Sequence, residues 1–213
     1  MKRFFIILIV AFVASISAYA QNLQDIQLNS PNKSRGSAVM KALSDRESVR
    51  EFDAKELSLQ DLSDLLWAAN GINREDGKRT APSAMNRQEI DVYVVKKDGA
   101  YLYDAAAHAL KGVASGDFRK AVAVSQDYVT TAPVCLILVA NLEKLGNPTE
   151  EGTRITAGLD AGIVSQNINI FCASVGLATV PRGTMNHAEL KQALKLSDTQ
   201  QLMLNNPVGY PVK

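Results

Sequence analysis

The stretch EIDVYVVKKDGAYLYD, residues 89–104, places two runs rich in β-branched and aromatic residues on either side of Asp98-Gly99. An Asp-Gly pair between two such runs is among the strongest short-range signals for a β-hairpin. The sheet to which these strands belong therefore contains antiparallel pairs. A second run, Val134–Ala140, is apolar throughout and too short for an average helix, which predicts a central strand buried on both faces.

Helical patterns lie on both sides of these strands. Ser58 can cap a helix whose apolar residues recur at helical spacing as far as Asn70-Gly71. From about Glu150 to Val175, apolar residues cover most of the circumference of the longest helical candidate, which predicts a helix buried nearly all round. Within it, Gly158 and Gly162 lie four residues apart and indicate either a helix-packing seam or mere tolerance of glycine.

The remaining elements are shorter. We expect helices over 39–45 and 186–196, helices of modest length over 105–124 with a break near Ser115-Gly116, and strands over 176–181 and 201–208. Because helices and strands intermingle around an antiparallel hairpin, the sequence predicts an α+β fold. Its central sheet is mixed or antiparallel and flanked by helices, and one long helix is buried at its centre.

The N-terminus has the pattern of a secretory signal peptide. Lys2 and Arg3 precede an uncharged apolar run, Phe4–Val13, and Ala18-Tyr19-Ala20 is a small-residue cleavage site. We expect cleavage after Ala20, a periplasmic or secreted protein, and no stable membrane span, because the apolar run is short. The predicted organisation is a signal peptide over 1–20, a flexible polar lead-in over 21–36, and one domain over 37–213.

Composition excludes several classes of protein. The chain has 213 residues, of which 46% are hydrophobic and 21% charged, with two Cys and two His, and this does not fit disordered, collagen-like or disulfide-rich chains. The formal charge is +1; without the signal peptide 21 basic and 22 acidic residues leave −1, so no nucleic-acid partner is expected. Serine-hydrolase, P-loop and Rossmann motifs are absent, and no metal-ligand spacing is present.

The few cysteines and histidines fit structural roles. Cys135 and Cys172 lie in apolar runs, as buried free cysteines usually do, although an oxidising compartment also permits a disulfide between them. His108 and His187 are typical of helix-surface or cap residues rather than of catalytic bases.

A cluster of arginines offers an anion site. In extended backbone the side chains of Arg46, Ser48 and Arg50 share one face, and two guanidiniums with a hydroxyl between them suit a phosphate. The alternative is a solvated arginine pair bridged to Glu47 and Glu51.

Three further segments combine polar, basic and glycine residues beyond the needs of a core. PSAMNRQ, residues 82–88, offers neutral donors and acceptors that can orient a heterocycle, or it simply caps a helix. Residues 177–184 end in Arg-Gly, where backbone N–H groups can meet a ligand, or they form an ordinary strand-to-helix turn. The end of the chain, residues 207–213 (PVGYPVK), is the last of these candidate segments, and its alternative is a loosely ordered terminus.

In this order and spacing, the segments resemble the nitroreductase family of FMN-dependent oxidoreductases over about Ser37 to Lys213. The matching segments are RESVREF (46–52), PSAMNRQ (82–88) and LDAGIVSQNINIFCASVGLATVPRG (159–183). LLWAANGINR (65–74) and PVGYP (207–211) resemble the branch that includes peptide azoline dehydrogenases. The resemblance implies an α+β homodimer with two FMN sites at the subunit interface.

The resemblance also implies which residues meet the flavin. Arg46, Ser48 and Arg50 would lie along its phosphate, ribityl chain and pyrimidine edge, and Arg182 and Gly183 would present backbone N–H groups near N5. Basic residues beyond the G-Y-P end complete the phosphate site in relatives. The implied cofactor-binding set is Arg46, Ser48, Arg50, Pro82, Ser83, Asn86, Arg182, Gly183 and Lys213, with no catalytic side chain, because the flavin carries the chemistry.

The activity that the resemblance implies is ping-pong transfer of a hydride. A reduced donor such as NAD(P)H reduces FMN and leaves, and a flat small-molecule acceptor, nitroaromatic or quinone-like, is then reduced in the same slot. Two alternatives remain open: an exported flavin dehydrogenase that oxidises an unknown substrate, and a flavin-binding protein without turnover.

Overall fold

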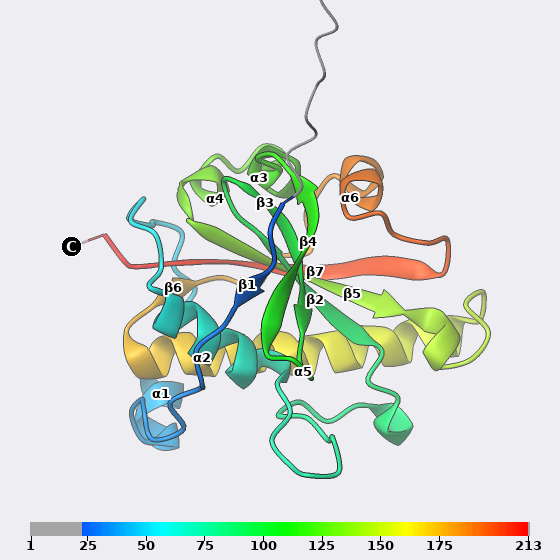
Figure 1. Ribbon diagram of the computed structural model, residues 1–213, viewed down its shortest axis with the longest axis horizontal. Helices are drawn as coiled ribbons and strands as arrows, with labels where there is room; N and C mark the ends of the chain where they lie inside the picture. Colours follow the sequence, from blue (N-terminus) through cyan, green and yellow to red (C-terminus); the bar gives the residue numbers. More distant parts are fainter. Residues whose placement is uncertain (1–22, 213) are drawn as a thin grey trace, which may run out of the picture.

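The computed structural model describes residues 23–212, so the predicted signal peptide lies outside the described residues. Its centre is a sheet in the order β1-β4-β3-β2-β5-β7-β6, in which every pairing is antiparallel (Figure 1). The strands are β1 (Ile26–Gln27), β2 (Ile90–Val95), β3 (Gly99–Asp104), β4 (Ala109–Ser115), β5 (Val134–Asn141), β6 (Ala178–Thr179) and β7 (Gln200–Gly209).

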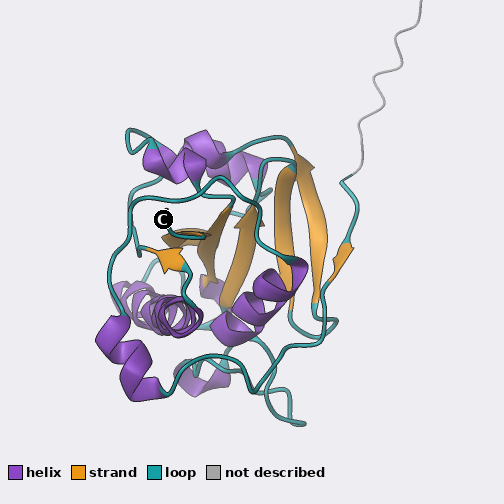
Figure 2. Cartoon of the chain, turned by 90° about the vertical axis from the view of Figure 1, so that its left-hand side faces the viewer, coloured by secondary structure: helices purple, strands orange, loops and turns teal. Residues whose placement is uncertain are grey.

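Helices cover both faces of this sheet (Figure 2). The helices and 3-10 turns are α1 (Val39–Asp45), α2 (Leu59–Asn70), η1 (Ala84–Asn86), α3 (Arg119–Ala123), α4 (Tyr128–Thr131), η2 (Leu142–Lys144), α5 (Glu151–Val175) and α6 (His187–Ala193). Among the described residues, no helix is long and apolar enough to cross a membrane.

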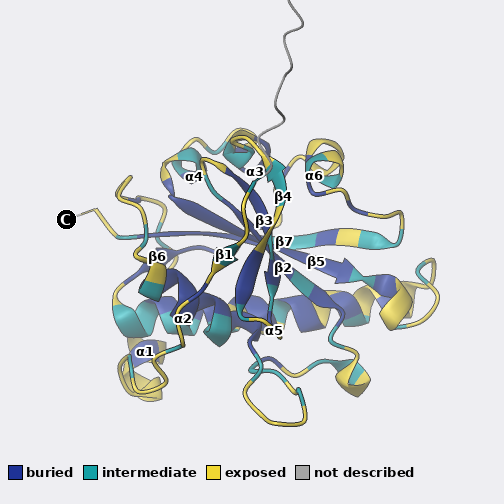
Figure 3. Ribbon diagram, viewed as in Figure 1, coloured by how far each residue is buried: buried dark blue, intermediate teal, exposed yellow. Residues whose placement is uncertain are grey.

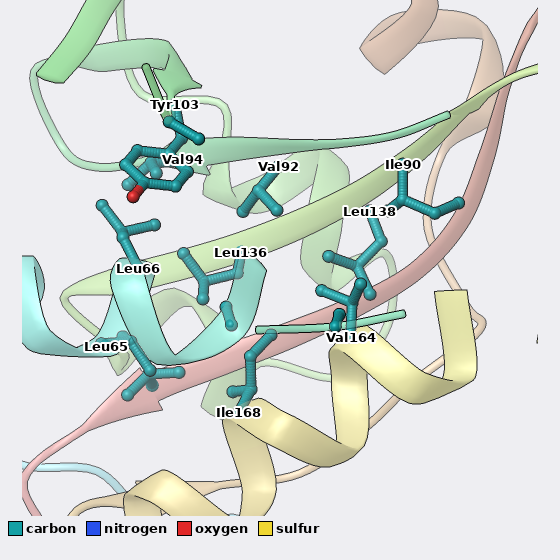
Figure 4. Packing of buried hydrophobic residues seen from close by; sticks show 14 of the residues in the cluster. Leu65, Leu66, Ile90, Val92, Val94, Tyr103, Leu136, Leu138, Val164 and Ile168 are labelled. Carbon is teal, nitrogen blue, oxygen red and sulfur yellow. The ribbon is translucent and has the colours of Figure 1, made fainter. Parts of the chain in front are cut away.

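Strand β5 divides the core into two layers. Leu136 and Leu138 pack with α2 and α5, whereas Cys135 and Ile137 pack with the helices on the other face. Because successive side chains of a strand point to opposite faces, an uninterrupted apolar run can fill both layers. Figure 4 shows the first layer, in which Ile168 of α5 lies beneath the strand. The predictions of a buried central strand and of the hairpin at Asp98-Gly99 are confirmed.

Helix α2 forms as its sequence indicates. The Ser58 hydroxyl accepts the Asp61 N–H at 3.0 Å and thereby satisfies one of the free donors of the first turn. The helix ends at Asn70, where the Gly71 N–H donates to the Trp67 carbonyl at 2.8 Å.

Helix α5 has the predicted length but not the predicted burial. Ile155, Leu159 and Ile163 are 56%, 65% and 37% exposed, so one face of the helix is apolar and uncovered within the chain (Figure 3). A Cβ built at Gly162 meets no atom within 4 Å, so this glycine does not allow close helix packing inside the chain. The periodicity correctly predicted an apolar circumference, but the sheet of one chain covers only one side of it.

The prediction of helices over 105–124 is wrong for most of that range. The Asp104 carboxylate accepts the N–H groups of Ala106 and Ala107, both at 3.0 Å, and so closes a tight turn. His108 follows with φ of 45°, and residues 109–115 return as β4 beside β3. Long-range pairing along the exposed edge of the hairpin overrides the helical preference of the alanines.

The segment expected to be a flexible lead-in contacts the domain over its described part. Ile26–Gln27 pairs with β4, and Leu28 is buried in the core. Arg35 forms ion pairs with Asp61 and Asp64 of α2. These contacts correct the prediction for residues 23–36, because the polar sequence hid one edge strand and one buried leucine.

Candidate functional site

The segment Arg46–Phe52 is extended and leaves two arginines unpaired. The Val49 N–H donates to the Thr179 carbonyl at 3.0 Å, and Phe52 forms a bridge with Pro211, so the backbone is held along the ends of β6 and β7. Arg46 and Arg50 have no hydrogen-bonded or ion-paired side-chain partner among the described residues. The alternative of arginines bridged to Glu47 and Glu51 is therefore wrong for the isolated chain.

Alternation along this segment separates its charges. Glu47 and Val49 line a cavity of about 270 Å³ between the segment, the C-terminal half of α5 and β6, and neither arginine lines it. In extended backbone Arg46, Ser48 and Arg50 share the opposite face. The acidic Glu47, which would oppose a bound phosphate, thus points away from the two cations.

The second predicted segment, residues 82–88, is a loop and short 3-10 turn at the opposite end of α5. The Asp160 carboxylate accepts the Ala84 N–H at 2.8 Å, and the Ser83 hydroxyl accepts the Gln88 N–H at 2.8 Å. Met85, Asn86 and Gln88 have positive φ angles of 50°, 52° and 49°, a conformation that costs non-glycine residues energy. The helix-capping alternative does not hold, because only the three-residue turn η1 follows Ser83, and its side chain does not cap it.

Pro82 and Ser83 line a small cavity of about 10 Å³ beside this loop, and Asn86 is exposed. Arg79 lies at the same cavity and donates to the Gln88 side-chain oxygen at 3.0 Å. Asp160 also lines it. The sequence argument missed Arg79 and Asp160, because neither has a recognisable spacing relative to the motif, and only the packing of α5 against the loop brings them there.

In the third segment, residues 177–184, the structure corrects the role predicted for Arg182. Arg182 is 7% exposed and its backbone N–H donates to the Asn205 carbonyl at 2.8 Å, so this N–H is not available for N5 of a flavin. Its guanidinium donates to Asn205 Oδ1 at 2.7 Å, to Gln126 Oε1 at 2.9 Å and to the carbonyls of Val122 and Ala123 at 3.2 and 3.3 Å. Arg182 is therefore a structural residue, whereas Gly183 is exposed with open space where a Cβ would be.

The C-terminal segment is ordered rather than loose. Residues up to Gly209 belong to β7, and the Tyr210 hydroxyl donates to Asp61. Lys213 lies outside the described residues. The described residues include no group of three or more His, Cys, Asp or Glu that could hold a metal ion, and Cys135 and Cys172 are buried free thiols.

The two parts of the predicted site lie far apart in one chain. The arginine segment borders a cavity that Asn169 and Ala173 of α5 line, whereas the loop 82–88 is attached to Asp160. Asn169 and Ala173 lie nine and thirteen positions after Asp160, which corresponds to about 14 and 20 Å along the helix axis. The exposed apolar residues of α5 begin before Asp160, at Ile155 and Leu159, and continue past it to Ile163.

The fold and site together define a class: an α+β protein whose open antiparallel sheet carries helices on both faces and whose candidate ligand-binding segments lie at its surface. The family model described as "Nitroreductase family" matches residues 43–210. A relative from Methanocaldococcus jannaschii, provisionally named a nitroreductase, is 30% identical over 177 residues, covering 79% of this chain and 88% of the relative.

Solved structures agree with this assignment. A provisionally named nitroreductase from Ralstonia eutropha is 35% identical, with a TM-score of 0.82 over 91% of this chain and 92% of its own. A Parabacteroides distasonis protein, provisionally named NADH dehydrogenase/NAD(P)H nitroreductase, has the same fold at 19% identity and a TM-score of 0.58, covering 82% and 88% of the two chains. The chain belongs to the nitroreductase family and is accordingly an oxidoreductase; the predicted family and α+β fold are confirmed.

Proposed function

We propose that this chain is an FMN-dependent oxidoreductase that takes electrons from NAD(P)H and passes them to a flat acceptor, nitroaromatic or quinone-like. The family assignment supports a flavin and a nicotinamide donor. The observation that carries the proposal is the pair of unpaired guanidiniums at Arg46 and Arg50, on the face of their segment opposite Glu47.

The residues present fit FMN at its charged end. Guanidiniums without protein partners can donate charge-assisted hydrogen bonds to phosphate oxygens without first breaking an ion pair. Ser48 between them adds a hydroxyl. At the ring, Pro82, Ser83 and Asn86 would line one side and the Gly183 N–H would point at the redox-active edge. When bound, FMN supplies the hydride chemistry, so the chain needs to bind and orient the reactants rather than supply a catalytic acid or base.

We further propose that the active protein is a homodimer. Within one chain, about 14–20 Å of helix separates the arginine segment from the loop 82–88. The same helix carries an exposed apolar face formed by Ile155, Leu159 and Ile163, and exposed patches of this kind mark protein interfaces. A two-fold pairing of α5 faces would cover this surface and bring the arginines of one subunit towards the loop of the other.

The dimer proposal has a direct test. Leu159→Lys places a charge on the exposed face of α5, and we expect it to convert a dimer to a monomer in analytical ultracentrifugation and to abolish flavin retention. Val124→Lys is the matched control and should change neither, because Val124 is also apolar and exposed but lies next to α3 on the other side of the sheet. A Leu159→Lys protein that remains dimeric would refute the proposed interface.

The flavin proposal is tested by an absorption spectrum of the purified protein, followed by anaerobic titration with NADH and NADPH and then with an acceptor. We expect the flavin band to bleach and to recover. Arg46→Ala should lose a charge-assisted contact of about 1.5–3 kcal/mol, or about a tenfold to hundredfold rise in the Kd for FMN. Lys120→Ala removes an exposed cation from α3 and should leave this Kd unchanged. An unchanged Kd in Arg46→Ala would show that the phosphate lies elsewhere.

The same titration separates the alternatives. Flavin that binds but neither bleaches nor recovers would indicate a binding protein without turnover. Export through the N-terminal signal peptide, which we propose from the sequence, would remove the chain from the cytoplasmic NAD(P)H pool. Bleaching by dithionite but by neither nicotinamide would therefore favour a dehydrogenase that receives its electrons from another substrate.

A further inference from the structure

Glu89 is a buried carboxyl to which no other described residue donates a hydrogen bond. It is 0% exposed, and neither of its side-chain oxygens has a hydrogen-bond partner among the described residues. It immediately follows the loop 82–88 and precedes β2, where its carbonyl accepts the Asn141 N–H at 2.9 Å. An ionised carboxylate in such a place would be costly, so the neutral acid is the form that this environment favours.

The neighbouring acid is Asp160 of α5. Burial, and next the Asp160 carboxyl, raise the pKa of Glu89 to about 7, whereas Lys144 of η2 opposes the rise. The other charged groups nearby have separate partners: Lys144 donates to the Gln88 carbonyl at 3.1 Å and Arg79 to the Gln88 side chain at 3.0 Å. Asp91 of β2, two residues further along the chain, is another acid in this region: burial raises its pKa, whereas Lys144 and Arg79 oppose the rise.

This pair of acids lies at both ends of a strained loop. Asp160 Oδ2 accepts the N–H of Ala84 at the start of the loop, and Glu89 is the residue that follows its end. Between them Met85, Asn86 and Gln88 keep positive φ angles. Such backbone strain persists only where surrounding contacts enforce it.

We propose that Glu89 and Asp160 form a proton-sharing carboxyl pair that latches the loop 82–88 in its strained conformation. With one proton between them, two adjacent buried acids carry a single charge, and Asp160 remains an acceptor for Ala84. When that proton leaves, two like charges face each other in the protein interior, and the pair can separate only if the loop opens and admits water. Glu89 is thus a positioning residue; that the loop lines a flavin rests on the proposed function.

The sign of the pH effect follows from proton binding. In the open loop Glu89 reaches water and titrates near its ordinary value of 4.5, whereas in the closed loop its pKa is about 7. Between these values the closed form binds more protons, so closure weakens as the pH rises, by about tenfold per pH unit. Above about pH 7 Glu89 is ionised in both forms and the opening equilibrium levels off.

The test is hydrogen exchange of the Ala84 amide, measured by NMR on the 15N-labelled protein with and without FMN from about pH 5 to 8.5 and corrected for intrinsic exchange. We expect protection to fall about tenfold per pH unit up to about pH 7 and then to level off. Glu89→Gln carries no titrating proton and should keep the Ala84 amide protected equally at every pH. Glu143→Gln, at an exposed glutamate of η2, should follow the wild type.

A second variant, at the other acid of the pair, tests the latch without relying on Glu89→Gln. Asp160→Asn retains an oxygen for the Ala84 N–H but removes the charge that opposes ionisation of Glu89, so its protection should level off at a lower pH than in the wild type. Flat protection in the wild type, pH dependence that survives Glu89→Gln, or an unchanged plateau in Asp160→Asn would each overturn the latch.

Failure of the latch and failure of the flavin proposal are distinguishable. If FMN binds and Ala84 protection does not titrate, the latch is wrong and the proposed function stands. If Ala84 titrates as expected while no FMN binds at any pH, the latch stands and the loop serves another ligand.

Discussion

Replacement of Arg182 by methionine tests whether this residue is structural. Its guanidinium is the hydrogen-bond donor for Asn205 Oδ1 at 2.7 Å and for the Val122 carbonyl at 3.2 Å, both of them buried. Methionine has a similar length but no donor. Each orphaned buried acceptor costs about 1–3 kcal/mol, so we expect Arg182→Met to lower the free energy of unfolding by about 2–5 kcal/mol.

The assay is urea denaturation of the flavin-free protein, since bound ligand would add its own stabilisation. Arg50→Met is the matched control: this arginine is exposed and has no side-chain partner among the described residues, so its stability should match the wild type. A loss below about 1 kcal/mol in Arg182→Met would refute the structural role. It would also reopen the possibility that Arg182 contacts the ligand directly.

Three further outcomes follow from packing and burial. Gly112→Ala should destabilise by about 1–3 kcal/mol in the same denaturation assay, because a Cβ there would lie 2.2 Å from the Leu23 carbonyl oxygen; an unchanged midpoint would show that the N-terminal segment does not cross the hairpin at this residue. Gly162→Ala should instead stabilise by up to about 1 kcal/mol, and a loss of dimer in sedimentation would reveal that a partner helix uses this glycine. Burial raises the pKa of Cys135 to about 12 and also raises that of Cys172, so neither thiol should react with a disulfide reagent at pH 8 until the protein is unfolded; labelling of the native protein would contradict their burial.

Local sequence patterns determined most of the elements. The Asp98-Gly99 hairpin, the Ser58 cap and the uninterrupted apolar run of β5 depend on contacts within a few residues or on a simple alternation of faces, and they form where the sequence predicts. The ordered motifs also identified the family, whose model matches residues 43–210.

Elements that depend on distant partners were not predictable in this way. The third strand over 109–115 exists because β3 offers it a hydrogen-bonding edge, and its alanines and glycines give no local signal for that. The polar segment 23–36 lies on the domain through a two-residue strand and Arg35, whose acidic partners are on α2. Likewise nothing in the spacing of Arg182 indicated that its guanidinium would be enclosed by carbonyl and amide oxygens.

The sequence by itself determined the family, the antiparallel hairpin and the buried central strand, because those properties depend on local pattern. Only the tertiary structure decided that Glu47 turns away from the arginines, that the arginine segment and the loop 82–88 contact different parts of α5, and that Glu89 and Asp160 are neighbours. The physical reason is that a side chain's burial, charge state and partners depend on what the rest of the chain packs against it.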